Sequence, residues 1–182
     1  MKTYKIAVIG GVLFALCAVV ALMARESQDR YTLKALNGVA FEEFKGYETW
    51  EVVAPSQTEQ GIKVILANPL MMKAYREGVP GNGKPFPEGS KIVKIEWAKQ
   101  PNPESQYAVN VPGALKSASF VEKDSKRFPD SSGWGYAQFL YDPKTETFKP
   151  FGADAHFGTK VCYPCYVAVK EKDYIFTAYP KR

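Results

Sequence analysis

The stretch Gly61-Ile62-Lys63-Val64-Ile65-Leu66-Ala67-Asn68-Pro69 contains a strand and the start of the helix that follows it. Its first seven residues are mostly β-branched and aliphatic, and such side chains pack well on a pleated sheet. Asn68 then supplies a helix cap, and Pro69 suits the first helical turn. Gly78 is expected to end this helix, because glycine tolerates the left-handed conformation found just past helix ends. The junction predicts a sheet with a helix beside it.

The segments on either side extend the sheet. Residues 50–53 form the expected preceding strand, with Pro55 and Ser56 in the turn between the two strands. Three prolines and three glycines make residues 79–89 a loop. The other expected strands are residues 91–97, 107–111, 117–121 and 134–141, and the other expected helices are residues 41–45, a single turn at 125–128, and 163–172. Strands outnumber helices and most connections are short, which predicts an α+β fold with a mostly antiparallel sheet and helices on one side.

The N-terminus is typical of an export signal. Lys2 and Lys5 come before residues 6–24, which carry no charge. A basic start followed by an apolar run is the pattern of a secretory signal, with cleavage expected after Ala24. The run is also long enough to span a bilayer, so an uncleaved N-terminal anchor is the alternative. We expect residues 1–24 to be a signal peptide or anchor, and residues 25–182 to form one periplasmic or otherwise exported domain.

The composition is that of a globular protein. The chain has 182 residues, with 24 Lys and Arg against 19 Asp and Glu, and 46% of its residues are hydrophobic. These values exclude a disordered or collagen-like chain. No run of like charges exceeds two residues, so nothing indicates a basic arm or a polybasic membrane patch. We therefore expect no nucleic acid among its partners.

The stretch Cys162-Tyr163-Pro164-Cys165-Tyr166 is the one motif whose spacing carries chemistry. The two cysteines are expected to project from one turn at the start of a helix. The spacing leaves four interpretations open: a redox dithiol, a structural disulfide, a zinc site and covalent attachment of a c-type haem. A zinc site would need two further ligands, and His156 is the only histidine. Haem attachment uses Cys-x-x-Cys-His, and Tyr166 stands at the histidine position.

Further stretches of the chain follow one another in a specific order and spacing. They are residues 50–53, 63–69, 73–78, 86–90 with Lys94 and Trp97, 121–128, 133–137, and 172–177 after the cysteine pair. Together these stretches resemble the cytochrome P-460 family, over about residues 35–180.

The resemblance implies an antiparallel sheet with helices, a homodimer, and one c-type haem lying against the sheet. It also implies binding or oxidation of small nitrogen compounds such as hydroxylamine and nitric oxide, together with an electron-transfer partner. Members that oxidise hydroxylamine carry a lysine cross-linked to the haem ring, and Lys94 matches that position by motif. Lys63 matches a basic residue on the distal side of the haem.

The strand at residues 91–97 has two interpretations. Ile92, Lys94 and Glu96 share one of its faces. In one interpretation this face is solvated and carries a neighbouring lysine–glutamate pair. In the other it lies under the haem, and Glu96 acts as a proton carrier. The second makes Lys63, Lys94 and Glu96 the candidate catalytic residues.

Tyr166 is the departure from the family pattern. The resemblance implies a haem held by Cys162 and Cys165, so that Tyr166 stands where the iron ligand belongs. Tyrosine ligates haem iron in catalase, and a phenolate ligand favours the ferric state. The alternative is a haem-free binding or scaffold domain that keeps the fold and closes a Cys162–Cys165 disulfide. His156 is expected to be a solvated loop residue.

Overall fold

The computed structural model describes residues 28–182. The predicted signal or anchor at residues 1–24 lies outside the described residues. Within residues 28–182, no helix is both long enough and apolar enough to cross a membrane.

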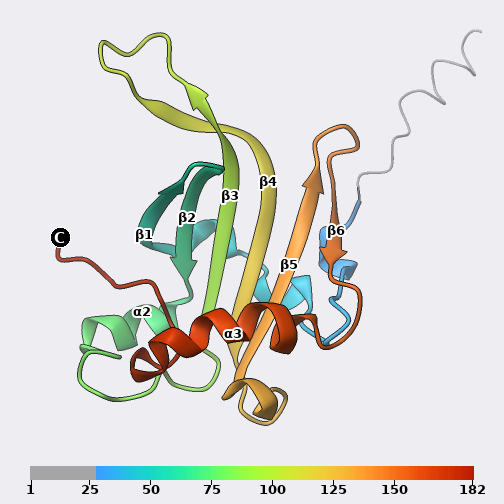
Figure 1. Ribbon diagram of the computed structural model, residues 1–182, viewed down its shortest axis with the longest axis vertical. Coiled ribbons are helices and arrows are strands. Elements are labelled where there is room, and N and C mark those ends of the chain that lie inside the picture. The colour runs from blue at the N-terminus through green and yellow to red at the C-terminus, as the bar shows by residue number, and fades with distance from the viewer. Residues whose placement is uncertain (1–27) are drawn as a thin grey trace, which may run out of the picture.

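Six strands form one antiparallel sheet in which each strand pairs with its neighbours in the sequence (Figure 1). This arrangement confirms the predicted α+β class and the antiparallel sheet. The strands are β1 (Glu51–Thr58), β2 (Gly61–Ala67), β3 (Lys91–Pro101), β4 (Asn110–Lys123), β5 (Trp134–Asp142) and β6 (Thr147–Phe151).

The prediction of the turn after the first strand is wrong. Pro55 and Ser56 lie inside β1, where Pro55 is opposite Val64. The turn falls instead at residues 59–60. Because β1 is an edge strand, a proline there need not interrupt the hydrogen bonding of a central strand.

The prediction of two strands at residues 107–111 and 117–121 is also wrong. Both segments contribute to the single long strand β4, which begins at Asn110 and continues through Pro112 and Gly113. The register between β3 and β4 shifts in this region, so the irregular residues are accommodated without ending the strand. Residues 125–127 form the expected single turn, closed by a hydrogen bond from the Phe128 amide to the Asp124 carbonyl oxygen at 3.0 Å, and a 3-10 helix follows at Pro129–Ser131. Strand β6 was not predicted.

Helix α2 (Pro69–Arg76) begins and ends as predicted. The Asn68 side chain accepts a hydrogen bond from the Met71 amide and a second from the Lys91 amide at the start of β3. Gly78 has a φ of 88°, in the left-handed region that favours glycine. The cap therefore joins the helix to the sheet as well as starting it.

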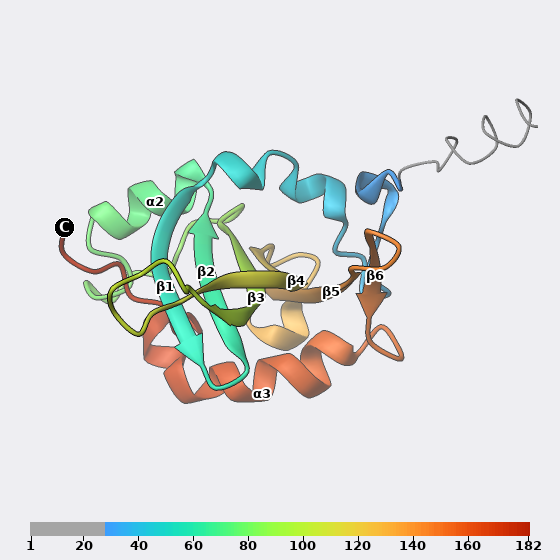
Figure 2. The same cartoon turned by 90° about the horizontal axis from the view of Figure 1, so that it is seen from above.

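Both faces of the sheet are covered, which corrects the expectation that helices lie on one side only. Short 3-10 helices at Arg30–Thr32, Phe41–Phe44 and Tyr47–Thr49 cover one face, and the C-terminal segment lies along the other (Figure 2). The buried side chains of α2 pack into the same core as the C-terminal segment. The side chains of a strand alternate between faces, so two apolar cores form. The N-terminal core includes Val39, Phe41, Phe44, Val93, Phe120 and Phe139, and the C-terminal core includes Val53, Ile65, Met71, Ile92, Trp134 and Tyr136.

The C-terminal segment is helical from Gly158 to Lys172, five residues earlier than predicted. It consists of a π-helix (Gly158–Cys162), α3 (Tyr163–Tyr166) and a 3-10 helix (Val167–Lys172). Asp173 and Tyr174 follow it, and both have left-handed φ angles, of 50° and 61°. These two residues turn the chain back towards the core, where Ile175 is buried.

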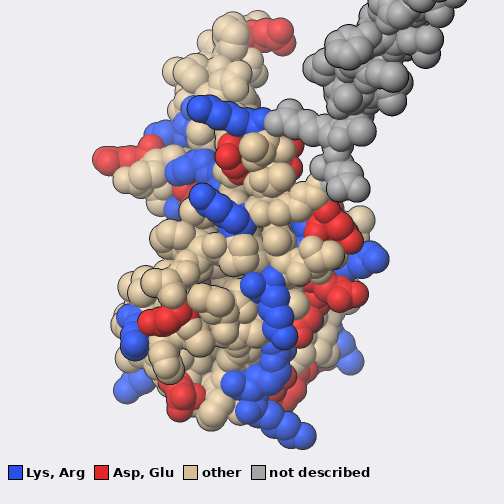
Figure 3. Space-filling model, turned by 90° about the vertical axis from the view of Figure 1, so that its right-hand side faces the viewer, with Lys and Arg blue, Asp and Glu red and all other residues tan. Residues whose placement is uncertain are grey.

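The surface mixes charges of both signs. On the face shown in Figure 3, basic side chains run down the lower half with acidic side chains beside them. Several of the charged residues form ion pairs, such as Arg127 with Glu43 at 2.9 Å.

Candidate functional site

The cysteine motif lies on the C-terminal segment, which packs against the sheet face that carries the C-terminal core. Cys162 is half-buried at the end of the π-helix, and Cys165 is exposed in α3. Both are free thiols. The spacing of three residues in helical backbone places both sulfur atoms on the same side of the segment.

The candidate catalytic residues share the sheet face beneath this segment. Lys63 in β2 is opposite Glu96 in β3, and Lys94 is opposite Ile65, so the register brings all three to one face. The Glu96 carboxylate lies 2.8 Å from the Lys116 ammonium and 3.9 Å from that of Lys63. The side chains of Lys63 and Glu96 are only 17% and 13% exposed. The face is therefore not simply solvated, and Glu96 pairs with Lys63 and Lys116 instead of with Lys94, its neighbour on the strand.

Lys94 differs from its neighbours because it has no ion-pair or hydrogen-bond partner among the described residues. Burial lowers the pKa of its ammonium, and the charge of Lys63 lowers it further. The group also interacts electrostatically with the Cys162 thiol. Burial raises the pKa of that thiol, and the Lys94 charge opposes the increase. Lys94 thus places a positive charge beside the motif, offset only in part by the Glu96 carboxylate.

Tyr166 packs into a group of aromatic side chains on this face. Its ring centroid lies 4.7 Å from that of Tyr136 and 4.9 Å from that of Phe176. Burial, with smaller contributions from the two thiols, raises the pKa of Tyr166 to about 12. As a free side chain Tyr166 is therefore a neutral phenol at neutral pH.

Tyr136 is the residue of this site that sequence reasoning missed. It lies in β5 opposite Val121 and is only 3% exposed. Its hydroxyl has no hydrogen-bond partner among the described residues. Alternation along β5 would place Tyr136 on the same face as Trp134. However, only the register across β3, β4 and β5 shows that this face is the one that carries Lys94.

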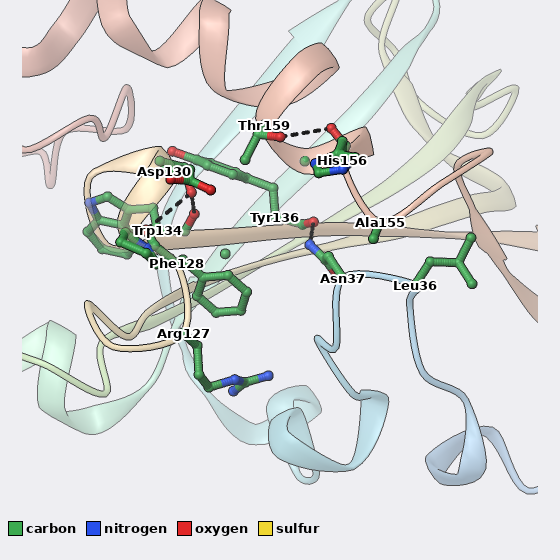
Figure 4. A pocket seen from close by; sticks show the side chains of 14 residues that line it. Leu36, Asn37, Arg127, Phe128, Asp130, Trp134, Tyr136, Ala155, His156 and Thr159 are labelled. Carbon is green, nitrogen blue, oxygen red and sulfur yellow. Dashed lines mark hydrogen bonds between the residues drawn. The ribbon is translucent and has the colours of Figure 1, made fainter.

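A hollow near the beginning of the C-terminal segment shares Tyr136 with this site (Figure 4). Its volume is about 210 Å³, and His156, Thr159, Asn37 and Arg127 are among its lining residues. His156 is exposed, and its backbone amide donates to the Asp154 carboxylate. Five hollows on the described part of the chain have volumes from about 10 to 650 Å³, and none of these five is lined by Cys162, Cys165 or Lys94.

Residues 44–177 match the protein family described as Cytochrome P460. The chain belongs to the cytochrome P460 family. The matched region contains both faces of the sheet, the cysteine motif and the residues beneath it. No curated protein is a significant match to the chain.

Membership in the cytochrome P460 family implies a haem cofactor, and the side chains present fit such a group. The segment packed against the sheet carries two free thiols, and their spacing is the one used for covalent attachment of haem. The unpaired ammonium of Lys94 and the unpartnered hydroxyl of Tyr136 lie on the same face. Residues 28–182 contain no group of three or more His, Cys, Asp or Glu side chains that could hold a metal ion. The thiols, Lys94 and Tyr166 are thus the groups in this cytochrome P460 domain that could hold a haem.

The structure brings most of the sequence-predicted site residues together. Lys63, Lys94 and Glu96 meet on one sheet face, and Cys162 and Tyr166 pack above that face. Cys165, on the same segment, is exposed. Lys116, which holds Glu96, was not predicted, because the shifted register of β4 is what brings its ammonium to that carboxylate.

Proposed function

We propose that this cytochrome P460 domain is an exported c-type haem protein that binds or oxidises small nitrogen compounds such as hydroxylamine or nitric oxide. The observation that carries the proposal is the pair of free thiols, one helical turn apart, on the segment that covers the Lys94 face. Each thiol would add across one vinyl group of the haem and form a thioether, as in other c-type haem proteins. An export route that keeps residues 1–24 as an anchor is compatible with this function.

Tyr166 is the proposed iron ligand. It follows Cys165 directly and lies four residues after Cys162, so Cys162 and Tyr166 occupy neighbouring positions on one helix face. Its high pKa means that the phenolate forms only beside a strong positive charge, which a ferric ion would supply. A phenolate ligand would favour the ferric state and lower the reduction potential of the iron.

Lys94, Lys63 and Glu96 have proposed roles in binding and proton movement. Because burial lowers the pKa of the Lys94 ammonium, this group releases a proton more readily than an exposed lysine does. The Glu96 carboxylate is held in place by Lys63 and Lys116 and can accept a proton at a defined position. A homodimer and an electron-transfer partner complete the proposal. Lys94 is also the candidate for a cross-link to the haem ring.

A haem-free binding or scaffold domain is the second candidate. The packing of Tyr166 between Tyr136 and Phe176 favours it, because aromatic side chains occupy the space next to the cysteines. In this case Cys162 and Cys165 would close a disulfide in the oxidising compartment.

Intact mass and absorption spectra separate the two candidates. The full chain would be exported from a host that has an active c-type haem maturation system. The proposed function requires an added mass of one haem and a Soret band that survives denaturation. A Cys162→Ser, Cys165→Ser double variant is the matched control and should lose both signals.

The same sample tests the finer assignments. Tyr166→His should change the absorption of the ferric protein if Tyr166 ligates the iron. A broadened, red-shifted Soret band that disappears in Lys94→Met would indicate the cross-link. A mass lower than that of the reduced chain by two hydrogen atoms, without a Soret band, would instead establish the disulfide and favour the haem-free candidate.

A further inference from the structure

The Tyr136 hydroxyl is a buried donor without an acceptor. Tyr136 is 3% exposed, and its hydroxyl oxygen makes no hydrogen bond to any described residue. Tyr75 is buried to a similar extent, at 6% exposed, but its hydroxyl donates to the Thr177 carbonyl at 2.8 Å. A buried hydroxyl without a partner lowers the stability of the fold, because it loses its hydrogen bonds to water. Such a group in a native domain therefore calls for an explanation.

The surroundings of Tyr136 point towards the cysteine motif. The Tyr136 ring lies 4.7 Å from that of Tyr166 and 6.5 Å from that of Tyr163. The hydroxyl also interacts electrostatically with the Cys162 thiol and the Asp173 carboxylate. A group attached at Cys162 and Cys165 would therefore lie close to this donor.

The backbone of Tyr136 is held from two sides. The Asn37 amide donates to the Tyr136 carbonyl oxygen at 2.8 Å. Gly158, at the start of the C-terminal segment, approaches the same oxygen so closely that an added Cβ would lie 3.1 Å from it. A side chain whose backbone is held in this way is a preorganised donor.

We propose that the Tyr136 hydroxyl donates a hydrogen bond to an anionic oxygen of the group held at Cys162, Cys165 and Tyr166. The proposal rests on the proposed function. Two oxygens have the required chemistry: the phenolate of Tyr166 and a carboxylate of the porphyrin. A hydrogen bond to either one withdraws negative charge from the metal, and it therefore raises the reduction potential.

The experiment compares Tyr136→Phe with Tyr75→Phe in the haem-loaded full chain. We expect Tyr136→Phe to lower the midpoint reduction potential and to shift the absorption of the ferric protein. Tyr75→Phe should leave both unchanged, because its hydroxyl bonds within the protein. Equal potentials and spectra in the parent and Tyr136→Phe would overturn the inference while the proposed function stands. A parent that acquires no haem would overturn both.

A second measurement uses chemical denaturation of the full chain before haem is attached. Tyr136→Phe should unfold at the same denaturant concentration as the parent or at a higher one, because it removes only an unpartnered hydroxyl. Tyr75→Phe should unfold at a lower concentration, since it loses a real hydrogen bond. An equal loss in both variants would show that Tyr136 has a partner in the protein itself, which would overturn the inference.

The background variant Tyr166→His identifies the acceptor. If the potential no longer responds to Tyr136→Phe in that background, the acceptor is the Tyr166 phenolate. If the response persists, the acceptor is the porphyrin carboxylate. Either result supports the donor role of Tyr136.

Discussion

Glu122, at the end of β4, has a buried carboxylate. Its charged neighbours have opposite effects on its pKa. Its side chain is 4% exposed and lies 3.0 Å from Arg127 and 3.8 Å from Lys91. Burial and the adjacent Glu43 together raise its pKa to about 7, although Arg127 and Lys91 oppose the increase. Glu43 belongs to the N-terminal 3-10 helix, where it also accepts from the Ala40 amide. The protonation of Glu122 therefore affects the contact between the N-terminal segment and the sheet.

The protonation of Glu122 should be visible in the pH dependence of the unfolding free energy. Because the folded pKa lies above the unfolded value near 4.5, the folded state binds the extra proton. The stabilisation is complete below pH 4.5 and is lost as the pH rises to about 7. Relative to Glu122→Gln, the parent should lose on the order of 1–3 kcal/mol of unfolding free energy over this interval. Denaturant unfolding at pH 4.5, 6 and 8 measures the difference.

The matched control for this prediction is Glu104→Gln, an exposed carboxylate on the β3–β4 hairpin. It should follow the pH profile of the parent. Parallel profiles for the parent and Glu122→Gln would contradict the assignment of the proton to Glu122.

At the scale of elements, the C-terminal segment depends on an ion pair at its end. The Asp173 carboxylate accepts from the Lys123 ammonium at 2.7 Å and from the Phe86 amide at 2.7 Å. The two side chains are 11% and 7% exposed, and the ammonium also lies 5.0 Å from the centre of the Trp134 ring. This pair connects the segment that carries the cysteine motif to β4 and to the loop at residues 79–89.

Asp173→Asn should destabilise the domain by about 3–5 kcal/mol, because it leaves the Lys123 charge buried without a counter-ion. Asparagine tolerates the left-handed conformation at this position, so the change removes charge without adding backbone strain. Hydrogen exchange should show the largest loss of protection in residues 157–175. Neutralising an exposed pair by Lys73→Met should change stability by less than about 0.5 kcal/mol. An effect of that small size for Asp173→Asn would mean that the pair does not hold the segment.

At the scale of the whole molecule, the sheet separates two cores. Val39 belongs to the core under the N-terminal segment, and Val53 belongs to the core under α2 and the C-terminal segment. Both are fully buried. The two cores share the sheet between them, so they should unfold together. In the folded state their side chains lie in separate environments.

Val39→Ala and Val53→Ala should each lower the unfolding free energy by about 2 kcal/mol, from lost burial and the remaining cavity. Because the two side chains belong to different cores, the effects should add to within about 0.5 kcal/mol in the double variant. A double-mutant cycle by denaturant unfolding measures the coupling. A clear departure from additivity would show that the sheet transmits strain between its faces.

Local pattern was enough to predict several elements of the fold. The strand at residues 61–67 and helix α2, with its Asn68 cap and Gly78 end, follow from side-chain type and capping chemistry within a few residues. The predictions of a turn at Pro55 and of a strand end at residue 111 were wrong because proline and glycine are tolerated where a strand lies at an edge or changes register. Those conditions depend on neighbouring strands.

The sequence by itself determined the antiparallel α+β class, the cysteine motif and the alternation that puts Lys94 and Glu96 on one strand face. Only the tertiary structure decided that Lys63 stands opposite Glu96 and that the cysteine segment packs above Lys94. It also decided that Tyr136 is a donor without a partner. The physical reason is that alternation and capping act over a few residues. Register, burial and hydrogen-bond satisfaction depend instead on residues far apart in the chain, which meet only when the fold forms.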